Sequence, residues 1–86
     1  MTRTVIAEWR RNAREEIAVA FDQYQGVDTV DIRCWYEDAA GVKKAGKSGI
    51  TLAIGRHLEP LATALAEAVE VARERGLLQP GGRRDD

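Results

Sequence analysis

Residues 24–52, YQGVDTVDIRCWYEDAAGVKKAGKSGITL, decide the fold of this chain. Apolar and polar residues alternate over residues 29–37, which predicts a strand with one buried and one solvated face. A turn at Gly26 precedes this strand, because glycine adopts backbone angles that other residues resist. The DAAG sequence at residues 38–41 then suits a four-residue hairpin turn. The centre of the fold is therefore predicted to be an antiparallel hairpin.

The second arm of this hairpin is predicted in two pieces. Residues 42–45 form a short strand, residues 46–49 a tight connection, and residues 50–54 continue the sheet with alternating aliphatic side chains. On the first arm, Val30, Ile32 and Cys34 share one face, which makes Cys34 an inert core residue rather than a nucleophile.

Two further strands are predicted before the central hairpin. Residues 4–9 and 17–21 both alternate, and the RRNAR sequence at residues 10–14 would join them. One helix is the competing interpretation, because Ile6, Trp9, Ala13 and Ile17 also share a helical face. Strand-favouring residues at 17, 19 and 21 favour the hairpin. Trp9 is expected in the core.

The last element is predicted to be a helix, with Pro60 in its first turn and Gly76 at its end. Its apolar stripe is wider than one sheet face requires. A helix of this kind fits between its own sheet and a partner subunit. The stripe contains Leu58, Leu61, Leu65, Ala68, Val69 and Ala72, and it is widened by Ala62, Ala64, Ala66 and Val71.

A chain of 86 residues is expected to form one domain, here residues 1–78, followed by a disordered tail at residues 79–86. So short a chain has a marginal core. Cys34 is the only cysteine, so no disulfide within the chain can help, and oligomerisation is the usual remaining route. No apolar run is long enough to span a membrane, and no secretory signal is visible. A cytoplasmic location is therefore expected.

The charge of the chain is uneven. A net charge of −1 argues weakly against a nucleic-acid partner. Residues 42–58, however, contain three lysines and one arginine without an acid. Screening limits charge effects to about 8 Å at physiological salt, so a ligand responds to the local patch.

Enzymatic chemistry is not expected. His57 is the only histidine, so neither a metal cluster nor a Cys–His pair can form within one subunit, and no cofactor is predicted. The sequence GVKKAGKS at residues 41–48 fits the pattern of phosphate-binding loops. That loop works only before a helix, whereas a strand is predicted here, so we reject a nucleotide-hydrolysing function.

The central stretch resembles the single-stranded-DNA-binding domain of the positive cofactor four transcriptional coactivators, in their short bacterial form. The resemblance spans about residues 16–65. It rests on Gly26, VDIR at 30–33, aromatic residues at 35 and 36, Asp38, Gly41, Lys44, Gly46 and GITL at 49–52. It implies an α+β fold, in which a curved antiparallel sheet of four to five strands is followed by one long C-terminal helix. It also implies a homodimer that binds single-stranded or melted DNA with little sequence preference and regulates transcription.

The resemblance also implies which residues bind DNA. Arg33 matches a DNA-contacting arginine, although a salt bridge with Asp31 is the alternative. Lys44 and Lys47 would meet phosphates, unless they belong to a merely solvated hairpin. The remaining expected DNA-binding residues are Tyr24, Trp35, Tyr36, Arg11 and Arg14, and those expected at the dimer interface are Leu61, Leu65, Ala68 and Val69.

Several departures from the family pattern predict weaker binding. Gln25, Val27 and Ser48 stand where basic residues are common, and Ala45 stands where proline is usual. A dimeric protein-interaction domain of the same fold, with weak or lost DNA binding, is therefore the alternative function. The resemblance leaves RNA and the transcription machinery open as further partners.

Overall fold

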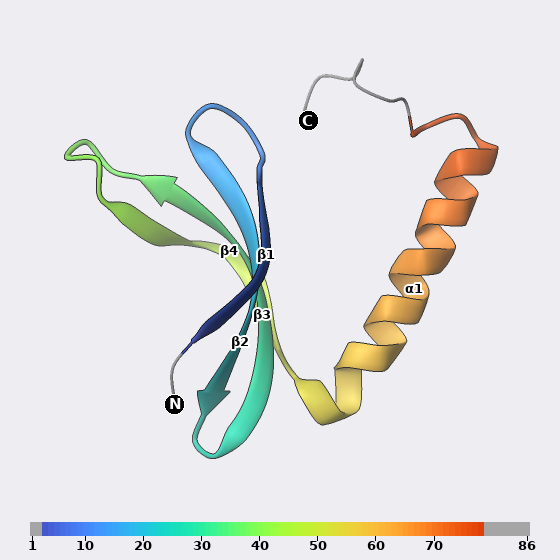
Figure 1. Cartoon of the computed structure of the whole chain (residues 1–86), viewed down its shortest axis with the longest axis horizontal. Helices are drawn as coiled ribbons and strands as arrows, with labels where there is room; N and C mark the ends of the chain where they lie inside the picture. The colour runs from blue at the N-terminus through green and yellow to red at the C-terminus, as the bar shows by residue number, and fades with distance from the viewer. Residues whose placement is uncertain (1–2, 79–86) are drawn as a thin grey trace.

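The computed structural model describes residues 3–78, so the predicted tail at residues 79–86 lies outside the described chain. Four strands are followed by one helix (Figure 1). These elements are β1 (Thr4–Arg10), β2 (Glu15–Tyr24), β3 (Val27–Glu37), β4 (Lys43–Ala53) and α1 (Ile54–Glu74). The α+β fold is confirmed, with four strands rather than five, and the N-terminal segment is a hairpin rather than a helix.

The strands lie in the order β1-β2-β3-β4, and every neighbouring pair is antiparallel. A two-residue turn joins β2 to β3, with positive φ angles at both Gln25 (51°) and Gly26 (80°). This is the backbone of a type I′ turn, whose twist matches that of the flanking strands. The predicted turn at Gly26 is confirmed.

The register gives the sheet an apolar face. Ile17 lies opposite Cys34, and Val19 lies opposite Ile32, which in turn lies opposite Ile50. Residues directly opposite each other share a face. We call the following set the apolar face: Trp9 of β1; Ile17, Val19 and Phe21 of β2; Val30, Ile32 and Cys34 of β3; Ile50 and Leu52 of β4.

The other face of the sheet is mostly polar. At its centre Ala18 and Ala20 are buried, and charged side chains surround them. We call the following set the polar face: Val5 and Glu8 of β1; Glu16, Ala18, Ala20 and Tyr24 of β2; Val27, Asp31, Arg33 and Trp35 of β3; Lys43, Gly49 and Thr51 of β4.

The second arm of the central hairpin differs from its prediction. β4 runs unbroken from Lys43 to Ala53, so no tight connection interrupts it at residues 46–49. The irregularity takes the form of a bulge instead. Arg33 pairs with Gly49 but Trp35 pairs with Ala45, so residues 46–48 lie opposite Cys34 alone. A bulge lets extra residues stay in a strand at the cost of local pairing.

The start of the helix was also predicted wrongly. α1 begins at Ile54, so Ile54 is helical and Pro60 lies inside the helix rather than in its first turn. The strand passes directly into the helix, because Ala53 is both the last residue of β4 and the N-cap. Ala53 makes no side-chain capping bond, and so the usual Ser, Thr, Asp or Asn signal is absent at this boundary.

The end of the helix follows the prediction. Gly76 has a φ of 71°. Its N–H donates to the carbonyl of Arg73, and the N–H of Leu77 donates to the carbonyl of Ala72 at 2.8 Å. These two bonds form a Schellman motif, in which glycine adopts the left-handed conformation.

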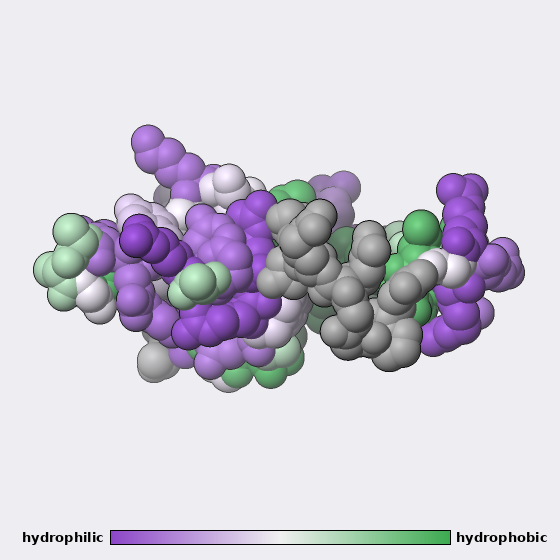
Figure 2. Space-filling view, turned by 90° about the horizontal axis from the view of Figure 1, so that it is seen from above, coloured by the Kyte–Doolittle hydropathy of each residue, from purple (hydrophilic) through white to green (hydrophobic). Residues whose placement is uncertain are grey.

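The helix packs little against its own sheet. Within the described chain no residue of α1 is buried, and the helix contacts only β3 and β4. The radius of gyration is 15.0 Å, against about 12 Å for a compact chain of this length. Figure 1 shows the helix standing away from the sheet, and Figure 2 shows its hydrophobic residues on the side toward the sheet and its hydrophilic residues on the outer side.

Candidate nucleic-acid interface

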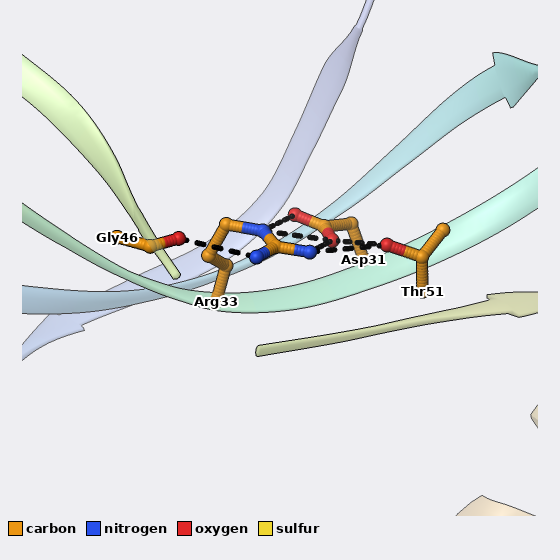
Figure 3. Close-up of polar contacts among 4 residues, drawn as sticks. All are labelled: Asp31, Arg33, Gly46 and Thr51. Atoms are coloured by element: carbon orange, nitrogen blue, oxygen red, sulfur yellow. Dashed lines mark hydrogen bonds and ion pairs between the residues drawn. The ribbon is translucent and has the colours of Figure 1, made fainter. Parts of the chain in front are cut away.

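Arg33 lies at the centre of the polar face and is held by three neighbours (Figure 3). Its Nη2 donates to Asp31 Oδ1 at 2.9 Å and to Thr51 Oγ1 at 3.2 Å, and its Nε also donates to the Asp31 carboxylate. Its Nη1 donates to the carbonyl of Gly46 at 3.1 Å. A guanidinium has five N–H donors, so these bonds leave one N–H for a ligand.

Two glycines make room for this guanidinium and its strand. A Cβ on Gly49 would lie 2.9 Å from Arg33 Cζ and 2.8 Å from the carbonyl oxygen of Ile32. A Cβ on Gly46 would lie 2.7 Å from the carbonyl oxygen of Cys34. Real Cβ atoms do not come so close, so the bulge and the arginine need glycine at both positions.

The electrostatics of this cluster favour the ion pair. Burial opposes the ionisation of Asp31, but hydrogen bonds from Arg33 and Thr51 and the charges of Arg33 and Arg3 outweigh it, and the pKa of Asp31 lies below its usual value. The hydrogen bond to Asp31 raises the pKa of Arg33. The salt bridge considered as the alternative role of Arg33 is therefore present, at 2.9 Å.

The lysines of β4 also have acidic neighbours. Lys44 Nζ lies 3.3 Å from Asp38, and Lys43 Nζ lies 2.9 Å from Glu16. The hydrogen bond from Lys43 lowers the pKa of Glu16 and raises that of Lys43. These lysines are about half exposed, so the pairs are weak and either lysine can turn to a phosphate at little cost.

The turn between β1 and β2 holds two of the predicted arginines. Asn12 Oδ1 accepts the N–H groups of Arg14 and Glu15, which closes the turn. Arg11 forms an ion pair with Glu15 at 3.0 Å. Within residues 3–78, the side chains of Arg14 and Lys47 form no ion pair or hydrogen bond, so among the predicted DNA-binding cations these two are the most available to an anion.

The aromatic residues lie on both faces. Tyr24 is 67% exposed at one end of the polar face, beside a hollow of about 540 Å³ lined by Val27, Thr29 and Thr51. Trp35 lies half-buried near the other end of that face. Tyr36 lies opposite Lys44, at the end of the apolar side.

The structure therefore brings Tyr24, Arg33 and Trp35 onto one face, and it places Tyr36 and Lys44 on the other. Trp9 is 53% exposed, so the prediction that it lies in the core is wrong for the single chain. The reason is that β1 is an edge strand and no described element covers the apolar face beside it.

One residue of this face was missed in the sequence. The guanidinium of Arg3 lies over the Trp35 ring, 4.7 Å from its centroid. Both residues line a hollow of about 230 Å³ with Glu8, Glu16 and Lys43. The available signal was the two-residue spacing from Val5, which puts Arg3 on the polar face. A single pair of residues with this spacing at the start of a chain is too short a pattern to predict a strand face.

Neither a metal cluster nor a membrane-spanning helix nor a phosphate-binding loop is found in the described part of the chain. Within residues 3–78, no three metal-ligating side chains come together, and no helix is long and apolar enough to cross a membrane. The GVKKAGKS segment runs from the β3–β4 turn into β4, and strand rather than helix follows it. This agrees with the rejection of a phosphate-binding loop.

Comparison with known proteins gives a family and two similar structures. The family model described as Transcriptional Coactivator p15 (PC4) matches residues 11–56. A PC4 homolog from Burkholderia pseudomallei is 25% identical with a TM-score of 0.65, over 85% of this chain and 93% of that one. A bacteriophage T5 homolog of the eukaryotic coactivator PC4, implicated in recombination-dependent DNA replication, is 19% identical with a TM-score of 0.62, over 91% and 85%. The second likeness shows the fold alone. No curated protein sequence matches the chain.

Proposed function

The chain belongs to the transcriptional coactivator p15 (PC4) family, and from this membership we propose that it binds single-stranded or melted DNA without catalysing a reaction. The role would be that of a transcription regulator with little sequence preference. The observation that carries the proposal is the row of Tyr24, Arg33 and Trp35 along the polar face. Aromatic rings and cations on one sheet face are the usual means of binding a single strand.

The length of the polar face fits an extended single strand of DNA. Val27, the partner of Tyr24, and Trp35 are eight positions apart on β3, or about 26 Å at the rise of a strand. This length offers room for several nucleotides between the two rings. Bases would stack on Tyr24 and Trp35 at the two ends of this face.

The phosphates would be met by cations of β3, of β4 and of the β1–β2 turn, of which Arg33 lies on the polar face and Lys44 on the opposite face. Lys47 and Arg14 are unpaired within the described residues, while Arg11, Arg33 and Lys44 would act from within ion pairs. Each neutralised phosphate contributes about −0.7 to the slope of log affinity against log salt for a single strand. Lys47 and Arg14 together therefore contribute about −1.4 to the slope per subunit.

The second part of the proposal is a homodimer. The apolar face and the apolar stripe of α1 leave large side chains exposed, among them Ile50 (49%), Leu65 (54%) and Val69 (41%). A second copy would cover both surfaces, with Leu61, Leu65, Ala68 and Val69 at the interface. Two polar faces on one dimer would then hold two segments of DNA and raise the overall affinity.

A dimeric protein-interaction domain is the second candidate function. The ion pairs of Arg11, Arg33 and Lys44 and the net charge of −1 favour it, because they reduce the positive charge offered to DNA. RNA and proteins of the transcription machinery are further candidate partners. Retention on heparin that falls with added salt would favour the DNA-binding function, and no retention would favour the protein-interaction domain.

The test of the DNA-binding proposal uses Tyr24, which is 67% exposed, so a substitution there should disturb the packing of the sheet little. Tyr24→Ala should weaken binding of a thymine 20-mer by about 1–3 kcal/mol, the usual value of one base–aromatic stack. Tyr24→Phe keeps the ring and should bind as the wild type does. Equal affinity of all three proteins in fluorescence anisotropy would show that no base stacks at this end of the polar face.

A further inference from the structure

The stacked side chains of Arg3 and Trp35 have hydrogen-bond donors that are not satisfied. Two buried donors, Arg3 Nη2 and Trp35 Nε1, have no hydrogen-bond partner among the described residues. Buried donors without acceptors are rare and costly. The guanidinium therefore covers the indole in an arrangement that an incoming group with acceptor atoms would improve.

The hollow beside the pair indicates what kind of group would enter. Its volume of about 230 Å³ is smaller than sites for drug-sized ligands, which start at about 300 Å³. It suits a single ring. Two cations, Arg3 and Lys43, and two acids, Glu8 and Glu16, line the hollow, so its formal charge is zero. A neutral ring with carbonyl oxygens fits this lining better than a phosphate does.

Resting on the proposed function, we propose that Trp35 is a base-stacking site and that Arg3 holds the place of the base until DNA binds. A nucleobase replaces the guanidinium on the indole face. Arg3 then turns its N–H donors toward the same nucleotide. The exchange is favourable because the base gains a stacking surface while the buried Arg3 Nη2, which has no acceptor in the unbound protein, becomes free to bond the same nucleotide. Arg3 can move because it lies just before β1, which is the edge strand of the sheet. Its long side chain can also turn away from the indole.

The two tryptophans of the chain make this site observable. Trp9→Phe leaves Trp35 as the only tryptophan, on the polar face, and Trp35→Phe leaves only Trp9, on the apolar face. On titration with a thymine 20-mer, the fluorescence of Trp35 in the Trp9→Phe protein should fall with the same midpoint as the rise in anisotropy. The Trp35→Phe protein should show no fluorescence change on the same titration.

An abasic 20-mer separates bases from phosphates. It carries the same deoxyribose-phosphate backbone and should leave the Trp35 fluorescence unchanged at concentrations where it binds. Quenching by the abasic oligomer equal to that by the thymine oligomer would overturn the proposal, since the hollow would then take a phosphate. A rise in anisotropy without quenching of Trp35 would also overturn it, while the proposed DNA binding would stand. No anisotropy change at low salt would remove both.

The role of Arg3 is tested by Arg3→Ala in the Trp9→Phe background. Without DNA, the emission of Trp35 should shift to longer wavelength in the Arg3→Ala protein, because the indole loses its cover. With saturating thymine 20-mer, the two proteins should have the same emission, because a base covers the indole in both. A difference that persists unchanged in the bound state would show that Arg3 stays on the ring, and would overturn the exchange.

Discussion

At the scale of single residues, Arg33 stabilises the sheet by hydrogen bonds as well as carrying a positive charge. Its guanidinium joins Asp31, Thr51 and the carbonyl of Gly46, and a lysine ammonium cannot reach all three at once. Arg33→Lys should therefore lower the free energy of unfolding by about 1–2 kcal/mol, because Asp31 is partly buried and loses bonds. Urea unfolding followed by circular dichroism would measure it.

The matched control for this substitution is Arg14→Lys, which makes the same chemical change in an exposed turn. Its stability should stay within about 0.5 kcal/mol of the wild type. If Arg33→Lys changed the free energy of unfolding no more than Arg14→Lys does, the hydrogen bonds of Arg33 would not stabilise the fold. DNA binding would then be the only role left for Arg33.

At the scale of elements, the turn between β3 and β4 depends on one carboxylate. Asp38 Oδ1 accepts the N–H groups of Ala40 and Val42, both at 2.9 Å. The bond from Val42 is the main cause that lowers the pKa of Asp38, and Lys44 adds to it. A lowered native pKa means that the unfolded chain binds more protons, so this stabilisation is present above the unfolded pKa and is lost as pH falls through the native pKa.

Asp38→Asn tests this turn, because an amide oxygen can accept the same two bonds but does not titrate in acid. The thermal unfolding midpoint of the variant should fall less steeply than that of the wild type as pH is lowered below about 4. Glu67→Gln removes one carboxylate from the exposed surface of α1 and serves as the control. Parallel acid limbs for wild type and Asp38→Asn would contradict the role of Asp38.

The elements that could be predicted are those in which local pattern and tertiary contact agree. The alternation in β3 reports two different faces, and Gly26 and Gly76 mark backbone angles that only special residues accept. The β4 bulge and the start of α1 could not be predicted in this way. Gly46 is needed because the Cys34 carbonyl lies close to it, and Ala53 ends the strand without a capping side chain. The first cause is a tertiary contact, and the second leaves no capping residue in the sequence to mark the boundary.

The candidate site was predictable by residue type but not by arrangement. Period-two spacing correctly separates Trp35 from Tyr36 and puts Arg33 with Trp35. It does not show that Asp31 engages Arg33 or that Arg3 covers Trp35, because both contacts depend on how side chains turn above the sheet.

At the scale of the whole molecule, the extended shape predicts a dimer. A single chain of 9.5 kDa leaves Leu65 and the apolar face exposed, so light scattering at micromolar concentration should give a mass twice that of the chain. Leu65→Lys places a charge in the apolar stripe of α1 and should shift the protein to monomer. Glu67→Lys adds a lysine to the same helix, outside this stripe, and should leave the dimer intact. A monomeric mass for the wild type would contradict the proposed homodimer.

The most direct test of the central claim is fluorescence anisotropy of a labelled thymine 20-mer, run as a single strand and, paired with its complement, as a duplex, at low and moderate salt. We predict tighter binding of the single strand, with an affinity that falls as salt rises because phosphate contacts contribute. The stacking part should persist at moderate salt, since it does not depend on charge. Equal affinity for both forms, or no binding at low salt, would contradict the proposal that the polar face binds unpaired DNA.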